Sequence, residues 1–150
     1  MKLKQLSIFL ENKPGALSAA CRLLAKAQIN IQTCTLADTQ QFGILRLIVP
    51  DWERAEEVLG KNGYVVKLTE VVAIEVEDQP GGLAAILEAL EGTGINVEYM
   101  YAFAGSHKAL LVFRFDKPDE AIKHLQAKGI KVTGRDEILK ALGGQGKVSK

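Results

Sequence analysis

The chain contains an internal sequence repeat of two copies, and this repeat constrains the fold more than any other feature. The dipeptide Pro14-Gly15 recurs as Pro80-Gly81, 66 positions later. The copies then align without a gap, and 14 of the 62 pairs formed by residues 6–67 and 72–133 are identical. Such agreement indicates duplication of a unit of about 66 residues. A unit this short buries little core by itself, so we expect the two copies to pack on each other.

Hydrophobic periodicity predicts the order strand, helix, strand, strand, helix, strand in each copy. Leu6, Ile8 and Leu10 alternate as in a half-buried strand. Apolar residues at helical spacing then follow in both copies: Leu17, Ala20, Cys21 and Leu24, and Leu83, Ile86, Leu87 and Leu90. Gly63 and Gly129 are placed to end the second helix of each copy in a left-handed conformation.

This order of elements predicts the fold class and the domains. We expect an α+β fold of two tandem ferredoxin-like βαββαβ sandwiches, each with an antiparallel sheet of strand order 4-1-3-2 and both helices on one face. Domain 1 would cover residues 1–69 and domain 2 residues 70–142, with almost no linker between them. Ile138, Leu139 and Leu142 predict a short C-terminal helix, and residues 143–150 a disordered tail.

The composition excludes several classes of function. The chain is 47% hydrophobic and 25% charged, as ordinary globular proteins are. Nineteen basic and 18 acidic residues give a net charge of +1, which argues against a nucleic-acid partner. No segment is long enough to span a bilayer or resembles a signal peptide, so we expect a cytoplasmic protein that does not bind membranes. Cys21 and Cys34 are interpreted as small buried apolar side chains.

Residues that could support other chemistry lack the necessary neighbours. The first loop, ENKPGAL, contains no thiol, so we expect no metal and no cofactor. His107 and His124 belong to no recognisable nucleophile constellation and are interpreted as surface histidines. Phe113 and Phe115 lie on a predicted strand, as base-stacking aromatics of RNA-binding domains do, but they are not part of a basic surface, and the first copy has Leu47 and Val49 at the matching places. The sequence therefore favours a protein that is not an enzyme.

The duplicated loop between the first strand and the first helix is the candidate site. In ENKPGAL and EDQPGGL, backbone N–H groups at the helix start and the positive end of the helix dipole could hold a carboxylate. The candidate ligand-binding residues are Asn12, Pro14, Gly15, Ala16, Leu17 and Asn30 in the first copy, and Asp78, Gly81, Gly82, Leu83 and Asn96 in the second.

A structural interpretation of the polar residues stays open beside the binding one. Asn12 and Asp78 could cap the helix or close an Asx turn. Asn30 and Asn96 could complete the loop that follows the helix. Asp78 stands where the first copy has Asn12, and a carboxylate there would repel a ligand carboxylate but attract an ammonium group. The two sites should therefore differ in affinity or orientation.

The pattern E-[ND]-x-P-G-[AG]-L, followed 12 positions later by I-N-[IV], resembles the ACT domain in both copies, over residues 3–69 and 70–134. ACT domains are small βαββαβ modules that bind amino acids and regulate enzymes of amino-acid metabolism. The resemblance implies a stand-alone tandem ACT protein whose ligand lies between paired modules. Asn12 and Asn30 match two binding positions of the family. Leu10 and Val76 replace the histidine of the serine-binding form, which argues against serine.

Two functions follow from this resemblance. The first is a non-catalytic regulatory protein that binds a free amino acid and modulates a partner enzyme of amino-acid or acyl-CoA metabolism. The alternative is a ligand-free structural or regulatory subunit of a biosynthetic enzyme, such as a synthase small subunit. A third, a small enzyme, would depend on His107 or another titratable group. We also expect a homodimer, because exposed sheet edges favour pairing.

Overall fold

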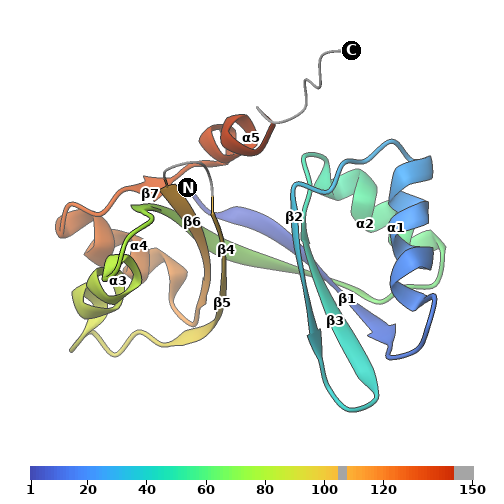
Figure 1. Ribbon diagram of the computed structural model, residues 1–150, viewed down its shortest axis with the longest axis horizontal. Helices are drawn as coiled ribbons and strands as arrows, with labels where there is room; N and C mark the ends of the chain where they lie inside the picture. Colours follow the sequence, from blue (N-terminus) through green and yellow to red (C-terminus); the bar gives the residue numbers. More distant parts are fainter. Residues whose placement is uncertain (105–107, 144–150) are drawn as a thin grey trace. The chain divides into compact units, whose positions relative to one another are not determined.

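The computed structural model describes residues 1–104 and 108–143, and its elements follow the predicted duplicated order. The first copy contains β1 (Leu3–Glu11), α1 (Ala16–Lys26), β2 (Thr33–Asp38), β3 (Phe42–Ile48) and α2 (Trp52–Lys61) (Figure 1). The second copy contains β4 (Val66–Glu77), α3 (Gly82–Leu90), β5 (Val97–Ala104), β6 (Lys108–Phe115), α4 (Pro118–Ala127) and β7 (Val132–Thr133). A final helix, α5 (Arg135–Gly143), follows. It takes in Gly143, the first residue of the predicted disordered tail, and the rest of that tail, residues 144–150, lies outside the described residues.

The chain divides into two compact units. One, called here the N-terminal module, contains Lys4–Thr69, and the other, the C-terminal module, contains Met1–Leu3 and Glu70–Lys140. Strand β4 contributes to both, because its 12 residues run without a break from Val66 to Glu77. The last strand predicted for the first copy and the first strand predicted for the second are thus one strand, and no linker separates them.

In the N-terminal module, β3 lies between β1 and β2, and both pairs are antiparallel. Leu47 faces Leu6 on one side and Cys34 on the other. Helices α1 and α2 cover one face of these strands (Figure 1). Alternating residues of the strands and two positions of each helix form the core, with Val66 and Leu68 at the start of β4 packed against it. Trp52 also packs at the edge of this core.

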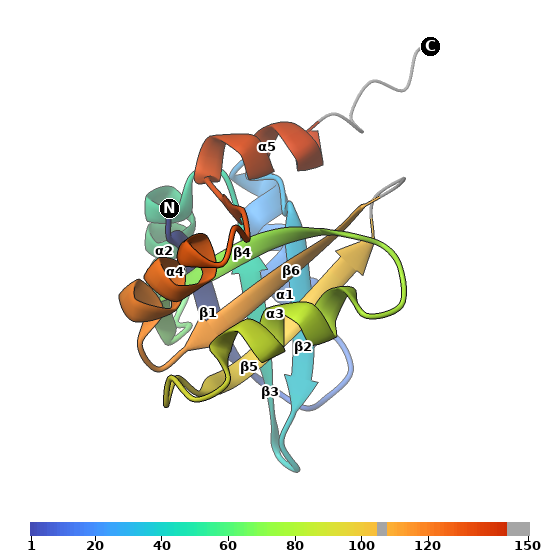
Figure 2. The same ribbon diagram turned by 90° about the vertical axis from the view of Figure 1, so that its left-hand side faces the viewer.

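The C-terminal module repeats this arrangement. Its strands have the order β7-β4-β6-β5, all antiparallel, which is the predicted order 4-1-3-2. Helices α3 and α4 cover one face of the sheet (Figure 2). The core brings together strand residues such as Ile74 and Phe113 with Ile86 and Leu90 of α3 and Leu125 of α4.

The apolar faces of α1 and α3 are narrower than their sequences indicate. Ala20 and Leu24 of α1 are fully buried, but Leu17 is exposed. In α3, Leu83 and Leu87 are exposed while Ile86 and Leu90 are buried. The buried residues of each helix are four apart, on successive turns that face the sheet, so these apolar residues on the flank stay largely in solvent. Cys34 is also exposed, contrary to the prediction, because it lies on the edge strand β2.

Candidate functional site

The two Pro-Gly loops have the same backbone conformation. In the N-terminal module, the Lys13 N–H donates to the Glu11 carbonyl at 2.9 Å and the Ala16 N–H to the Lys13 carbonyl at 3.3 Å. The C-terminal module repeats both hydrogen bonds, at 2.9 and 3.2 Å, from Gln79 to Glu77 and from Gly82 to Gln79. The duplication therefore copied the backbone of the loop, and any difference between the copies lies in their side chains.

Glycine supplies the turn into each helix. Gly15 (φ 84°) and Gly81 (φ 91°) cap α1 and α3 in the left-handed region, which residues with a Cβ rarely adopt. Neither helix has a side chain bonded at its cap, so Asn12 and Asp78 do not act as N-caps. Among the helix-start amides that were expected to hold a carboxylate, that of Ala16 is used inside the turn.

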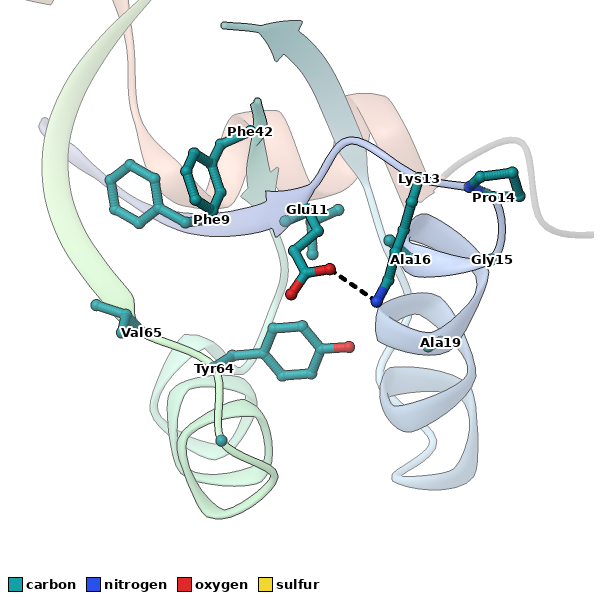
Figure 3. A pocket seen from close by; sticks show the side chains of 12 residues that line it. Phe9, Glu11, Lys13, Pro14, Gly15, Ala16, Ala19, Phe42, Tyr64 and Val65 are labelled. Atoms are coloured by element: carbon teal, nitrogen blue, oxygen red, sulfur yellow. Dashed lines mark ion pairs between the residues drawn. The ribbon is translucent and has the colours of Figure 1, made fainter. Parts of the chain in front are cut away.

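A pocket of about 650 Å³ lies beside the loop of the N-terminal module (Figure 3). This volume is in the range of small-molecule sites in proteins. Every residue that lines it belongs to this module: Phe9, Leu10, Glu11, Lys13, Pro14, Gly15, Ala16, Ala19, Phe42, Gly63, Tyr64 and Val65. Three of the candidate residues, Pro14, Gly15 and Ala16, are among them.

The wall opposite the loop is positioned by the end of α2. Gly63, with φ 87°, follows this helix, and its N–H donates to the Gly60 carbonyl at 3.1 Å. The Tyr64 N–H donates to the Leu59 carbonyl, also at 3.1 Å. Together these bonds form a Schellman motif, which fixes the direction in which the chain leaves the helix. The Tyr64 ring consequently points toward the loop (Figure 3).

One ion pair lies at the pocket. Lys13 Nζ is 2.7 Å from Glu11 Oε2, and both side chains are largely exposed. The hydrogen bond that the ammonium group donates to this carboxylate raises the pKa of Lys13, so the ammonium group is charged at neutral pH. The pocket therefore presents one positive and one negative group side by side, at the point where the loop begins (Figure 3).

The rest of the mouth is apolar and open to solvent. Phe9 is 47% exposed, Phe42 48% and Val65 69%. Because Glu11 lies opposite Phe42 in the strand pair, Phe9 and Phe42 share one face of the sheet as diagonal neighbours. Large apolar side chains at a concave surface are typical of sites that take an apolar group.

The other candidate residues of this module do not reach the pocket. Asn12 is exposed, and its N–H donates to the Gln41 carbonyl at 3.1 Å, which ties the loop to the β2–β3 turn. Leu17 is exposed on α1. Asn30 lies beyond the far end of α1, a helix of 11 residues and thus about 16 Å long. Within one module, Asn12 and Asn30 therefore do not converge.

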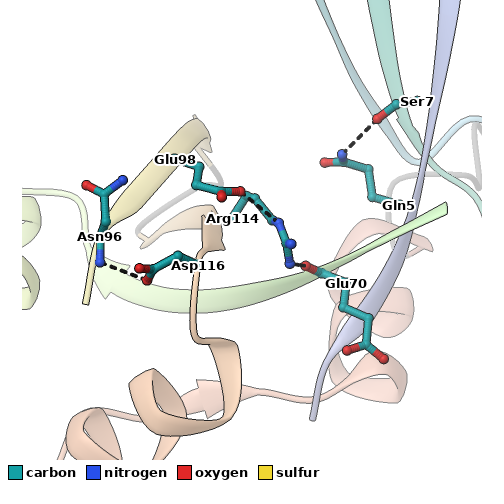
Figure 4. Close-up of polar contacts among 7 residues, drawn as sticks. All are labelled: Gln5, Ser7, Glu70, Asn96, Glu98, Arg114 and Asp116. Atoms are coloured by element: carbon teal, nitrogen blue, oxygen red, sulfur yellow. Dashed lines mark hydrogen bonds and ion pairs between the residues drawn. The ribbon is translucent and has the colours of Figure 1, made fainter. Parts of the chain in front are cut away.

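In the C-terminal module, the candidate residues are likewise spread out. Asp78 is exposed beside the loop. Asn96 lies past the far end of α3, and its N–H donates to Asp116 Oδ1 at 2.9 Å. Figure 4 shows this bond near Arg114, whose Nε donates to Glu98 Oε2. The bond is made by the backbone of Asn96 and would be open to any residue but proline, so it leaves the role of the asparagine side chain a prediction.

Several pocket residues were missed by the sequence reasoning. Phe9, Phe42, Tyr64 and Val65 lie outside the Pro-Gly motif and come from three separate segments, whereas Glu11 opens the motif but was not among the candidates. The signal that could have found them is the comparison of the two copies. At the positions 66 residues later, the chain carries in the same order Glu75, Lys108, Ile130, Lys131 and Glu77.

The structure also decides between some alternative chemistries. Phe113 and Phe115 are fully buried and stack on each other with ring centroids 5.2 Å apart, so they cannot stack on bases. His124 is exposed, as predicted, whereas His107 lies outside the described residues. Within residues 1–104 and 108–143, no group of acidic, histidine or cysteine side chains could hold a metal ion. No helix in the same ranges is long and apolar enough to cross a membrane.

Fold and site together define a class of protein: a duplicated ferredoxin-like module with the same Pro-Gly loop in each copy. The sequence matches the ACT domain pair family over residues 1–141. The chain therefore belongs to this family, which confirms the resemblance seen in the two sequence copies.

Known proteins share this architecture. Protein BT0572 from Bacteroides thetaiotaomicron is 40% identical, with a TM-score of 0.88 over 93% of this chain and 97% of that one. The regulatory subunit of aspartate kinase from Thermus thermophilus has the same fold, with 16% identity and a TM-score of 0.60 over 83% of this chain and 90% of that one.

A curated relative has a similar sequence over part of the chain. The acetolactate synthase small subunit of Buchnera aphidicola subsp. Baizongia pistaciae (strain Bp) is 34% identical over 82 residues. This match covers 53% of the chain and 50% of that protein, so the chain spans about half the length of the curated relative it matches.

Proposed function

We propose that this ACT domain pair is a regulatory protein without catalytic activity, which binds a free amino acid at the Pro-Gly loop of its N-terminal module. The observation that carries the proposal is the pocket beside that loop, with the Lys13–Glu11 ion pair at its edge. An amino acid is a zwitterion, so its carboxylate and its ammonium group can each pair with one of these side chains. The amino end of α1 adds a favourable field for the carboxylate.

The partner would be an enzyme of amino-acid or acyl-CoA metabolism. Two similar proteins are named as subunits of larger assemblies, the acetolactate synthase small subunit and the regulatory subunit of aspartate kinase. By analogy, the chain would associate with a separate catalytic chain and change its activity when the amino acid binds. A homodimer is the expected form of the free protein, to be checked by light scattering on the purified chain.

Titration of the full-length chain with each of the twenty amino acids tests the ligand. Isothermal calorimetry should show binding by at least one of them, with a matching rise in unfolding temperature. Binding should weaken in Lys13→Gln. This substitution introduces glutamine, the residue type that the second copy has at the matching position, Gln79. Arg22→Gln, a change on an exposed part of α1, is the control and should bind normally.

If no amino acid binds, the proposed ligand is wrong and the alternative gains support. That alternative is a ligand-free subunit of a biosynthetic enzyme, similar to the synthase small subunit. Affinity purification of the tagged chain from its own cells would then recover a catalytic chain whose association does not depend on any amino acid. Recovery of a partner only when amino acid is added would instead support the regulatory proposal.

A further inference from the structure

The two copies of the loop have the same backbone conformation but different neighbouring side chains. Both loops carry the same pair of turn hydrogen bonds and the same left-handed glycine, as described above. The strand registers also correspond, because Glu11 faces Phe42 in one module and Glu77 faces Lys108 in the other. Side chains 66 positions apart can therefore be compared directly, as occupants of the same place on the same scaffold.

At the pocket mouth, apolar residues of the first copy are replaced by charged residues of the second. Glu75 stands in the place of Phe9, and Lys108 in the place of Phe42. These two form an ion pair, with Lys108 Nζ 2.9 Å from Glu75 Oε1. The place of Val65, the most exposed of the three apolar residues, is taken by Lys131. Charged side chains there favour contact with water and disfavour an apolar ligand.

The loop charges differ as well. The first copy has the Lys13–Glu11 pair, whereas the second has Gln79 and Glu77 at these positions. The C-terminal loop thus keeps the carboxylate and lacks the ammonium group that would pair with a ligand carboxylate. Asp78, beside it, adds a second negative charge near the same loop. A zwitterion at the C-terminal loop would therefore meet two acidic groups and no counterpart of Lys13, while Lys108, which lies opposite Glu77, is already paired with Glu75.

From these differences we propose that the N-terminal pocket selects amino acids with a large apolar side chain, and that each chain binds one such molecule. The ligand's side chain would lie against Phe9, Phe42 and Val65, which now expose apolar surface to water. Its carboxylate would pair with Lys13 and its ammonium group with Glu11. The C-terminal loop would be a structural copy that binds no amino acid. This inference rests on the proposed function, since it names the ligand class of the same pocket.

The energetic argument concerns the exposed rings. Covering an aromatic side chain removes apolar area from water and is favourable in proportion to that area. Phe9 and Phe42 each leave nearly half of their surface exposed in the free chain, so an apolar ligand can cover both at once. A small or polar amino acid would satisfy the ion pair but leave the rings in water. Selectivity for large apolar side chains follows from this difference.

The test compares ligands on the full-length chain by calorimetry. Leucine, isoleucine, methionine and phenylalanine represent the apolar class, and glycine, serine, aspartate and lysine are the controls. We expect the best apolar ligand to bind at least about tenfold more tightly than any control, with one molecule per chain. Two analogues of that ligand, one lacking the carboxylate and one lacking the ammonium group, should both bind more weakly.

A double variant transfers the second copy's surface to the first. Phe9→Glu with Phe42→Lys introduces the pair that the C-terminal module already carries on the same scaffold, so the fold should tolerate it. We expect apolar amino acids to lose at least about tenfold in affinity. Glu75→Ala with Lys108→Ala is the matched control in the other module and should leave affinity and stoichiometry unchanged. Thermal unfolding of both variants reports whether each is folded.

If the double variant does not fold, Val65→Lys tests the same wall at a residue whose side chain is mostly in solvent, and it too should weaken binding of the apolar ligand. Equal affinity for polar amino acids, a stoichiometry of two, or unchanged binding in the Phe9 and Phe42 variant would each overturn this inference while leaving amino-acid binding intact. Absence of any binding would overturn the proposed function itself.

Discussion

Lys108 and Glu75 form an ion pair 2.9 Å long at the two sheet positions that carry Phe42 and Phe9 in the other copy. Both pairs are diagonal neighbours on antiparallel strands, because each residue lies two positions along from its neighbour's direct partner. The same geometry thus supports an aromatic surface in one module and a charged one in the other.

The Lys108–Glu75 pair should affect stability in a pH-dependent way. Hydrogen bonding to Glu75 raises the pKa of Lys108 above 10.5. Because the folded-state pKa is raised, the contribution is fully present below pH 10.5 and is lost as pH rises through the higher folded value. Lys108→Gln should therefore unfold at a slightly lower urea concentration at pH 8, and at the same concentration as the parent well above the raised pKa. An equal difference at both pH values would contradict this assignment. The effect should be small and should decrease with salt, since the pair is exposed.

Gly15 and Gly81 should each be sensitive to alanine. A Cβ at either position meets no atom within 4 Å, so the cost of Gly15→Ala or Gly81→Ala comes from the positive φ alone. We expect each to lower the free energy of unfolding by about 1 kcal/mol, measured by urea denaturation. Gly60→Ala is the control, because Gly60 lies within α2 without a positive φ and also has open space around it. That change should raise stability by about 0.5–1 kcal/mol.

Arg114 should stabilise the C-terminal module through its fork of donors. Its Nε binds Glu98 Oε2 at 3.0 Å and its Nη1 binds the Glu70 carbonyl at 3.1 Å (Figure 4). A lysine keeps the charge but has no comparable planar fork. We expect Arg114→Lys to cost about 1 kcal/mol in urea denaturation, while Arg22→Lys on the exposed side of α1 changes little. Equal effects of the two substitutions would show that the fork contributes nothing.

Glu57 should titrate below the ordinary pH of a glutamate. Its carboxylate accepts a hydrogen bond from Lys61 one helical turn later, which lowers the pKa of Glu57 below 4.5. The stabilising effect is therefore present above pH 4.5 and is lost as pH falls through the lower folded value. Carbon-detected NMR titration of Glu57 should show this low pKa, and Lys61→Gln should raise it. No upward movement in the variant would exclude Lys61 as the cause.

The sequence was sufficient for most of the fold because a repeat supplies two independent samples of one pattern. Strand alternation at Leu6, Ile8 and Leu10 and the helix-ending glycines Gly63 and Gly129 all have the predicted structure. The burial of helix faces was predicted less well. Hydrophobic periodicity indicates which residues share a helix face, but it does not indicate how much of that face the sheet covers. For this reason the sequence predicted burial of Leu17, Leu83 and Leu87, which are exposed.

The pocket could be predicted only in part, for a geometric reason. Pro14, Gly15 and Ala16 form a local motif and are recognisable from adjacent letters. Tyr64 and Phe42 reach the same pocket from positions far along the chain, because strand pairing and the end of α2 bring them there. Asn30 was expected at the site but lies away from this pocket. A helix about 16 Å long separates it from the loop with which the sequence pattern grouped it.

The unbroken strand β4 has a consequence for how the protein is turned over. Proteases cleave folded proteins at exposed loop tips and linkers, where the backbone can enter their active sites. Between Thr69 and Glu70, where one module ends and the other begins, the backbone is in the middle of a strand. We therefore expect limited digestion to find no preferred cleavage site between Thr69 and Glu70.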